Sequence, residues 1–156
     1  MNAAYVTLAV AGETYAVAAA AVSEVVKLQP LTRIPAMPRC VRGLMNLRGT
    51  VIPVVDLAQQ LGVGETEITD RTCVAVVDTP EAGGVRSLMG VISHEVQDVV
   101  LVDESAIEAA PAFGSRVPPG YLAGLARVGE KAVLVLDLAR ILSADEILAV
   151  HEAARA

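Results

Sequence analysis

Short runs of apolar residues, many of them β-branched, recur along this chain and are separated by turn-forming residues. Runs of this length that are rich in valine and isoleucine are typical of β-strands. The runs with readable bounds are residues 5–10, 14–18, 50–55, 71–78, 86–92, 96–102, 122–128 and 131–136. With two further candidates described below, about ten short strands and few helices predict an all-β chain.

Residues 19–26 carry a mixed signal, because their alanines favour a helix whereas their three valines favour a strand. We expect a short helical turn that leads into a strand ending before Pro30. Three prolines then follow, at positions 30, 35 and 38. Proline lacks an N–H and biases its predecessor toward extended geometry, so this segment is predicted to be a loop.

Two aspartates, Asp56 and Asp137, precede short apolar segments that they can cap as helices, over residues 57–61 and 138–142. Near the end of the chain, Ser143 and Glu146 have the spacing of a capping box. This spacing predicts a C-terminal helix that extends to about residue 154. No linker splits the chain into independent domains, and no internal repeat stands out.

The stretch from Val41 to Leu57 is the most informative part of the chain, because two apolar runs flank a turn that presents a single arginine. Residues 46–49 have the chemistry of a tight reversal, with Gly49 free to take a positive φ. The pattern predicts a stiff β-hairpin with Arg48 at its tip.

Charge is unevenly distributed along the 156 residues, although the net charge is −6. No acidic residue occurs between Glu24 and Asp56, and this segment holds five of the twelve basic residues. A positive patch on an acidic body would steer association with an acidic partner. The alternative is that these are ordinary solvated side chains. The acidic total argues against nucleic-acid binding, which needs a clustered basic surface.

The composition points to a cytoplasmic protein that does not insert into a membrane. No apolar stretch is long enough to span a bilayer, and the first residues lack the features of a signal peptide. Aromatic residues supply only 3% of the chain, so the core must be built from aliphatic side chains. Cys40 and Cys73 have no metal or redox spacing, and we expect both to be small buried hydrophobes.

A search for catalytic groups gives no convincing site, and the sequence predicts neither an enzyme nor a bound metal or cofactor. Residues 62–64 form a glycine-containing fragment, but it follows a helix, whereas a phosphate loop needs a strand before it. The two histidines, His94 and His151, lie far apart. Cys40 with His94 lacks the local signature of a cysteine hydrolase.

Several motifs in this chain match one known family. They are V-S-E-V at 22–25, T-R-I-P at 32–35, G-L-M-N-L-R-G-T-V-I-P-V-V-D-L at 43–57, the segment 107–113 and Y-L-A-G-L at 121–125. Together they resemble the CheW-like coupling proteins of bacterial chemotaxis. The resemblance implies a single domain over residues 1–156, made of two intertwined, small five-stranded β-barrels of SH3-like type with short helices and a C-terminal helix.

The resemblance also implies a non-catalytic adaptor that links the cytoplasmic tip of a chemoreceptor to the regulatory domain of a CheA-type histidine kinase. The resemblance further implies recruitment to membrane-associated receptor arrays and possible self-association in array rings. On matching positions, Val22, Glu24, Gly43 and Arg48 are the candidate receptor-binding residues, and Phe113 is the candidate kinase-binding residue. Two alternatives stay open. Arg48 can instead form an ion pair, with Glu24 as its candidate partner, that holds the two barrels in register, and Phe113 can be core.

One departure from the family pattern occurs at Ser93 and His94, where the family has a Val-Asp pair. This departure fits a divergent adaptor of a pilus-motility or other alternative pathway. His94 either adds pH sensitivity to partner binding or is a neutral, hydrogen-bonded histidine. A second class of function is a self-assembling or generic peptide-binding β module without a kinase partner.

Overall fold

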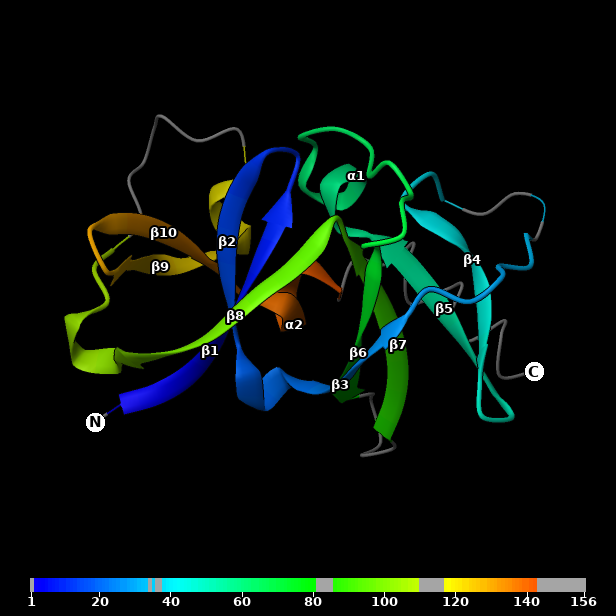
Figure 1. Cartoon of the computed structure of the whole chain (residues 1–156), viewed down its shortest axis with the longest axis horizontal. Coiled ribbons are helices and arrows are strands. Elements are labelled where there is room, and N and C mark those ends of the chain that lie inside the picture. Colours follow the sequence, from blue (N-terminus) through cyan, green and yellow to red (C-terminus); the bar gives the residue numbers. More distant parts are fainter. Residues whose placement is uncertain (1, 34, 36–37, 81–85, 110–116, 143–156) are drawn as a thin grey trace.

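The computed structural model of the chain describes residues 2–33, 35, 38–80, 86–109 and 117–142. The predicted C-terminal helix and Phe113 lie outside these residues. The described part consists mainly of ten β-strands in two five-stranded sheets, with a few short helices (Figure 1). The prediction of an all-β chain is therefore confirmed.

The two sheets are built from different parts of the chain. In the order in which they pair, the strands of the first sheet are β8 (Glu95–Asp103), β1 (Asn2–Val10), β2 (Glu13–Ala18), β10 (Lys131–Leu136) and β9 (Leu122–Val128). Those of the second sheet are β3 (Val22–Lys27), β6 (Cys73–Pro80), β7 (Arg86–Ser93), β5 (Thr50–Asp56) and β4 (Val41–Leu47). The helices are η1 (Ala19–Ala21), α1 (Leu57–Leu61), η2 (Glu104–Ala106), η3 (Pro119–Tyr121) and α2 (Leu138–Ile141). The first sheet thus contains strands from both the N-terminal and the C-terminal parts of the chain.

Neither sheet closes into a full barrel by strand pairing within the described residues, but the two five-stranded sheets fit the SH3-like type that the family resemblance implies. Instead, the chain that leaves each edge strand crosses to the opposite edge and touches it at one residue. Thr32 bridges Leu44 of β4, and Glu108 bridges Leu125 of β9. On one side of Thr32 the reason is Pro30, because it has no N–H to donate the hydrogen bond that would extend the bridge into a ladder.

The two sheets are copies of one arrangement, a repeat that the sequence pattern did not show. Hairpin β4–β5 followed by α1 corresponds to hairpin β9–β10 followed by α2, with residue numbers 81 apart (Gly43 and Gly124). Both hairpins shift register at this glycine, and both second strands pair in parallel with an inner strand. Edge strands β3 and β8 correspond with an offset of 74, since Val22 matches Val96 and Val25 matches Val99.

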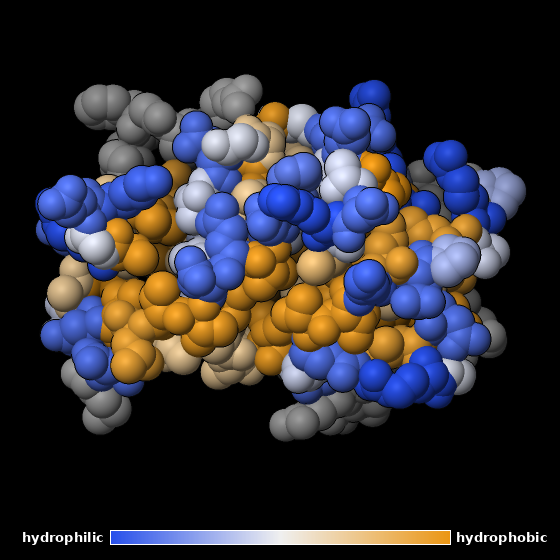
Figure 2. Space-filling model, in the orientation of Figure 1, coloured by the Kyte–Doolittle hydropathy of each residue, from blue (hydrophilic) through white to orange (hydrophobic). Residues whose placement is uncertain are grey.

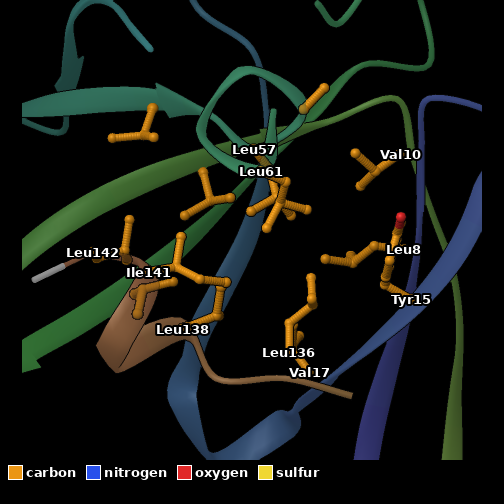
Figure 3. Packing of buried hydrophobic residues seen from close by; sticks show 14 of the residues in the cluster. Leu8, Val10, Tyr15, Val17, Leu57, Leu61, Leu136, Leu138, Ile141 and Leu142 are labelled. Atoms are coloured by element: carbon orange, nitrogen blue, oxygen red, sulfur yellow. The ribbon is translucent and has the colours of Figure 1, made fainter. Parts of the chain in front are cut away.

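The largest hydrophobic cluster lies between the sheets and draws residues from both of them. Helices α1 and α2 occupy equivalent places in it, and Figure 3 shows Leu61 and Ile141 pointing into the cluster that Leu8 and Val17 also enter. Each sheet also has a smaller cluster of its own, around Met45 in the second sheet and around Tyr5 in the first.

Local signals correctly placed η1, α1 and α2. The side chain of Asp56 caps α1 by accepting a hydrogen bond from the amide of Ala58, and Gly62 ends the helix with a φ of 76°. Residues 19–27 form the expected helical turn and strand, η1 and β3. Cys40 is buried as predicted, whereas Cys73 at the start of β6 is only partly buried.

Candidate functional site

The β4–β5 hairpin presents Arg48 at its tip, as the sequence predicted. Leu47 pairs with Thr50, and the two residues between them both have positive φ, 49° for Arg48 and 91° for Gly49. The amide of Gly49 donates to Oδ1 of Asn46 at 2.8 Å, which closes the turn. This turn matches the twist of the flanking strands, but it holds an arginine in a conformation that non-glycine residues rarely adopt.

Arg48 forms an ion pair with Glu24, so the intramolecular partner considered in the sequence analysis is present. The alternative that this pair holds the two barrels in register is wrong, because Glu24 lies on β3 and both residues belong to the second sheet. The pair spans the gap between the two edges of that sheet. The side chain of Arg48 is 69% exposed and that of Glu24 is 33% exposed. Both remain accessible to a partner.

Gly43 is buried beneath the segment that crosses to β4. A Cβ atom there would lie 2.9 Å from the carbonyl oxygen of Thr32 and 3.0 Å from Cβ of Leu31. The backbone φ of 152° also favours glycine. Gly43 is therefore required by the close approach of two chain segments, and any effect on a partner would pass through the loop that covers it.

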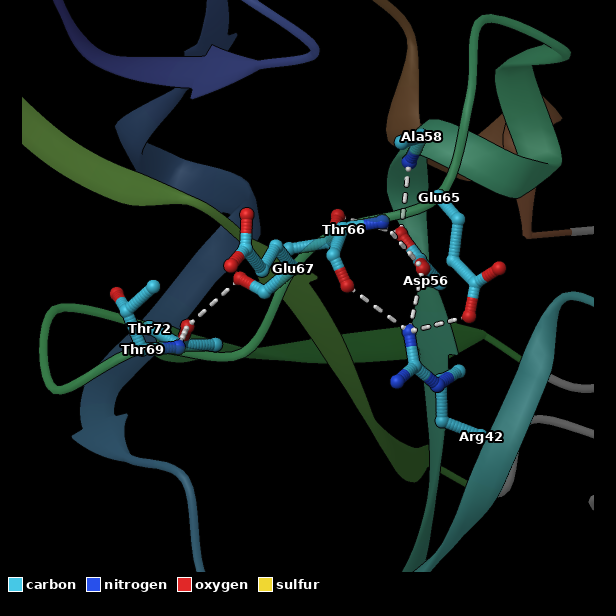
Figure 4. Close-up of polar contacts among 8 residues, drawn as sticks. All are labelled: Arg42, Asp56, Ala58, Glu65, Thr66, Glu67, Thr69 and Thr72. Carbon is cyan, nitrogen blue, oxygen red and sulfur yellow. Dashed lines mark hydrogen bonds and ion pairs between the residues drawn. The ribbon is translucent and has the colours of Figure 1, made fainter.

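Asp56 organises a second polar cluster next to the hairpin (Figure 4). Its carboxylate is fully buried and accepts hydrogen bonds from Nη1 of Arg42 at 2.9 Å and from the amide and hydroxyl of Thr66 at 2.9 and 2.6 Å. Arg42 also donates to the carbonyl oxygen of Thr66 at 3.2 Å. This cluster fastens the loop after α1 to the second sheet, and it meets the rule that buried charges are paired.

The positive patch expected between Glu24 and Asp56 is smaller than the sequence indicated. Of its five cations, Arg42 is paired with Asp56 and Arg48 with Glu24. The other three, Lys27, Arg33 and Arg39, are exposed. The acidic residues that bound the segment in sequence fold back onto it and neutralise part of its charge.

The structure reveals an exposed apolar surface that sequence reasoning missed. Val25 on β3 is 42% exposed, and Val99 and Leu101 on β8 are 69% and 73% exposed. Next to them, Val22 and Val96 are half-buried against the central core. We call these five residues the β3–β8 face. Both strands lie on the side turned to the viewer in Figure 1, and Figure 2 shows apolar side chains gathered over both.

The sequence hid this face because four consecutive apolar residues, 99–102, look like a strand buried on both sides. In the structure only alternate residues face the interior. Val100 and Val102 contact the core of the first sheet, while Val99 and Leu101 point the other way, beyond the area that the second sheet covers. The signal that could have revealed the face is its repetition at equivalent positions of β3 and β8.

The departure from the family pattern, at Ser93 and His94, lies where the chain passes from the second sheet to the first. Ser93 is buried at the end of β7, and His94 is the exposed residue between β7 and β8. The amide of His94 donates to the carbonyl oxygen of Ala9 at 3.1 Å, which fixes the crossover. The ring of His94 therefore lies on the surface, and its effect on partner binding stays a prediction.

Shifts in pKa are resolved at two groups of the first sheet, away from the hairpin tip. Burial, followed by the charge of Glu104, raises the pKa of Tyr5. Hydrogen bonds from the hydroxyl and amide of Ser105 lower the pKa of the Asp103 carboxyl. Both shifts move titration further from neutral pH, so neither group changes its charge between pH 6 and 8.

Among the described residues, no three histidine, cysteine or acidic side chains are grouped so that they could hold a metal ion. No helix in the described ranges is long and apolar enough to cross a membrane. What the described residues do present are contact surfaces: a hairpin tip with an ion pair, and an apolar face on two edge strands.

The hairpin tip and the β3–β8 face place the protein in the class of scaffolds, in which two β-sheets present surfaces for contact. A family model described as the CheW-like domain matches residues 4–146. The chain therefore belongs to the CheW-like family, a family of non-enzymatic adaptors in chemotaxis.

Individual relatives agree with this membership. The chemotaxis protein CheW of Klebsiella aerogenes is 27% identical over 143 residues, which cover 92% of this chain and 83% of that protein. The chemotaxis protein CheW of Bacillus subtilis is 38% identical over 100 residues, 64% of this chain and 61% of that protein. The crystal structure of the scaffolding protein TtCheW from Thermoanaerobacter tengcongensis superposes with a TM-score of 0.81 at 28% identity, covering 94% of this chain and 91% of that one.

Proposed function

We propose that this protein couples the cytoplasmic tip of a chemoreceptor to the regulatory domain of a CheA-type histidine kinase, without catalysis of its own. Membership of the CheW-like family supports an adaptor role in chemotaxis. The observation that carries the proposal is the exposed apolar β3–β8 face, because an adaptor needs accessible surface for a partner. It would act on the cytoplasmic side of a receptor array.

The β3–β8 face has the properties of a docking surface. β3 and β8 are edge strands, and Val99 and Leu101 are more than two-thirds exposed on one of them. Isolated apolar residues on a surface are common, but apolar side chains gathered on sheet edges invite association. A partner helix with an apolar stripe would bury them against the half-buried Val22 and Val96 behind them.

On the receptor side, the proposal assigns Val22, Glu24 and Arg48 to contacts, and Gly43 to an indirect role. Val22 belongs to the β3–β8 face, whereas Glu24 and Arg48 form the accessible ion pair at the sheet edge. The guanidinium of Arg48 has donors that the single pair with Glu24 does not use, and these can bind carboxylates or carbonyl groups of a receptor helix. Gly43 would act by holding the crossing segment in place.

On the kinase side, the proposal assigns Phe113, which lies outside the described residues. A large aromatic side chain is a common anchor of an interface. Substitution of Phe113 by alanine is expected to weaken binding of the kinase regulatory domain while leaving receptor binding intact. The measurement is a titration of both partners against the same variant.

The first experiment titrates the protein against a receptor cytoplasmic fragment and, separately, against the kinase regulatory domain. Leu101→Gln is expected to weaken receptor binding by about tenfold, because burial of a leucine contributes about 1.5 to 3 kcal/mol. Ile68→Gln is the matched control, since Ile68 is also exposed (48%) but lies outside the β3–β8 face. It should leave both affinities unchanged.

An equal loss of receptor affinity in Leu101→Gln and Ile68→Gln, or an unchanged receptor affinity in Leu101→Gln, would remove the β3–β8 face from the proposal. No binding of either partner up to about 100 μM, about 5 to 6 kcal/mol of binding free energy, would remove the adaptor role itself. Concentration-dependent rings in sedimentation without kinase would then favour the self-assembling module. Partner affinities that do not change between pH 6 and 8 would exclude a switch at His94.

A further inference from the structure

One difference between the two copies of the repeat coincides with a cavity. In the second sheet, the gap between β3 and the β4–β5 hairpin is spanned by Arg48 and Glu24. In the first sheet, the position equivalent to Glu24 is Asp98 on β8, and the position equivalent to Arg48 is Gly129 in the β9–β10 turn. The first sheet thus keeps the acid and lacks the arginine.

Strand register supports this equivalence on both sides of the gap. Leu47 and Thr50 close a two-residue turn in one hairpin, as Val128 and Lys131 do in the other. The φ angles of Arg48 and Gly129 are 49° and 63°, in the same left-handed region. The edge ladders of β3 and β8 also shift register at the same step, which includes Glu24 in one and Asp98 in the other.

A cavity of about 380 Å³ occupies the gap in the first sheet. It is lined by Thr7, Thr14, Glu95, Gln97, Asp98, Val100, Val128, Lys131 and Val133. Val128 and Lys131 are the residues that flank the turn at Gly129, and Asp98 faces them from β8. We call this cavity the first-sheet cleft. It lies where the arginine of the other sheet makes its ion pair.

The lining of the cleft suits a long cationic side chain. Val100, Val128 and Val133 supply apolar surface for a methylene stem. The carboxylates of Glu95 and Asp98 can accept hydrogen bonds from a guanidinium, as Glu24 does in the second sheet. Glu95 has Arg71 at 3.6 Å, while no ion pair of Asp98 occurs among the residues that the structure describes. Asp98 is therefore the carboxylate in the cleft that can pair with an incoming cationic side chain.

Backbone contacts hold Asp98 in place for this role. Its amide donates to Oγ1 of Thr7 at 3.0 Å, and the hydroxyl of Thr7 donates to the carbonyl oxygen of Asp98 at 3.3 Å. These bonds fix the main chain of β8 at the register shift and leave the carboxylate exposed. The backbone that carries the acceptor is therefore fixed before a ligand binds, which lowers the entropic cost of binding.

We propose that the first-sheet cleft binds an arginine side chain that a partner protein presents, with Asp98 as its principal acceptor. The second sheet fills the same gap from within, because its hairpin carries Arg48. The first sheet has glycine there and receives its arginine from another chain. This interaction is separate from the β3–β8 face, and it does not depend on which partner the adaptor couples.

Lys131 is a competing cation in the cleft, and it makes arginine more suitable than lysine as a ligand. Lys131 lines the same cavity as Asp98, and the two form no ion pair within 4.0 Å among the described residues. The planar guanidinium of arginine matches the geometry of a carboxylate and can stack beside a neighbouring charge. The ammonium of a second lysine is instead a compact point charge. Removal of Lys131 should therefore strengthen arginine binding.

The test is an NMR titration of the full chain, labelled with ¹⁵N, with N-acetyl-L-arginine amide. N-acetyl-L-citrulline amide, which has nearly the same shape and no charge, is the control ligand. The arginine compound is expected to give saturable shifts at the amides of Thr7, Asp98 and Lys131, with a Kd in the millimolar range. Its Kd should be about fivefold lower than that of the citrulline compound, as expected for one partly exposed ion pair.

Four variants make the test specific. Asp98→Asn should raise the Kd by about fivefold, and Lys131→Gln should lower it. Gly129→Arg should abolish binding, because it supplies an arginine from within, and no atom lies within 4 Å of a Cβ at this position. Gly129→Ala is the matched control, since it changes the same backbone position without a cation, and it should retain binding.

Absence of saturable shifts up to about 50 mM ligand, where less than about 2 kcal/mol of binding free energy would remain, would overturn the proposal. Equal shifts with the citrulline compound, or binding that survives Gly129→Arg, would also overturn it. The titration contains neither kinase nor receptor, so its failure is distinguishable from failure of the proposed adaptor function.

Discussion

Arg48 combines a costly backbone conformation with a modest ion pair. A positive φ costs a non-glycine residue about 1 kcal/mol or more, and an exposed ion pair returns about 0.2 to 1 kcal/mol. The side chain of Arg48 is 69% exposed, so its ion pair with Glu24 is a surface pair. The free energy of folding therefore does not explain why the hairpin tip carries an arginine instead of glycine, which favours a role in binding.

We predict that Arg48→Gly changes the free energy of unfolding by less than about 1 kcal/mol, because relief of the positive φ offsets loss of the ion pair with Glu24. Arg48→Ala keeps the strained backbone and should be about 0.5 kcal/mol less stable than the parent protein. Urea denaturation of the three proteins measures this. A loss of more than about 2 kcal/mol in both variants would mean that the arginine is structural.

Asp56 and Asp137 are equivalent residues of the repeat that have different surroundings. Both cap a helix, but Asp56 is fully buried and also binds Arg42 and Thr66, whereas the side chain of Asp137 is 33% exposed. Asp56→Asn should lower the free energy of unfolding by about 3 kcal/mol. Arg42 would lose its buried counter-charge, and the new amide group would place a donor opposite the N–H of Thr66.

Asp137→Asn is the control for this prediction and should cost less than about 0.5 kcal/mol, because asparagine is an equally good N-cap. Denaturant midpoints at pH 7 compare the two variants directly. Equal losses in both would contradict the prediction, because they would show that the cluster of Arg42 and Thr66 makes Asp56 no more important than Asp137.

At the scale of elements, each sheet is held in its curled shape by a crossing segment that touches the opposite edge. The amide and carbonyl groups of Thr32 and Leu44 exchange hydrogen bonds of 2.8 Å, and those of Glu108 and Leu125 exchange bonds of 2.8 and 2.9 Å. A glycine lies beside each bridge, and a Cβ at Gly124 would be 2.5 Å from Cγ2 of Ile107 and 2.8 Å from the backbone carbonyl oxygen of Glu108. Glycine permits both close approaches.

We predict that Gly124→Ala costs about 1 to 3 kcal/mol, because the crossing segment is backbone at this point and must move. Hydrogen exchange should show faster exchange at the amides of Glu108 and Leu125, with little change at the Thr32 and Leu44 bridge of the other sheet. Gly120→Ala is the control, since Gly120, like Gly124, has no positive φ, but no atom lies within 4 Å of a Cβ there. Unchanged protection at Glu108 would contradict the prediction.

At the scale of the whole molecule, the two sheets share their largest hydrophobic cluster, so their stabilities should be coupled. Leu61 of α1 and Ile141 of α2 are fully buried in it, next to residues from both sheets (Figure 3). The polypeptide also passes from the first sheet to the second and back, through η1 and through His94. The second sheet is formed by one continuous segment, residues 22–93, whereas the strands of the first sheet come from both sides of that segment.

Leu61→Ala is therefore predicted to lower the free energy of unfolding by about 2 to 5 kcal/mol and to leave one cooperative transition. Amide protection should fall by similar factors in β1 and β6, one strand from each sheet. Ile52→Ala, in the cluster of the second sheet alone, provides the comparison. Two separate transitions in either variant would show that the sheets unfold independently.

By itself, the sequence determined the local structure and the class of fold. Turn chemistry at residues 46–49 predicted the hairpin and the position of Arg48, and both short helices begin at the aspartates that the sequence marked as caps. These features depend on neighbours a few residues away, which is why they can be read from the chain. The all-β pattern and the family motifs likewise needed no contacts between distant segments.

The tertiary structure decided what each of these residues contacts. Strand alternation gives two faces to β8, but only the extent of the second sheet leaves Val99 and Leu101 exposed. Asp56 could be predicted as a cap, whereas its bonds to Arg42 and Thr66 depend on a loop that folds back. The repeat is carried by strand register, which constrains backbone pairing and tolerates different side chains, so it escaped the sequence. For the same reason only the fold shows that Gly129 stands where the other sheet has Arg48.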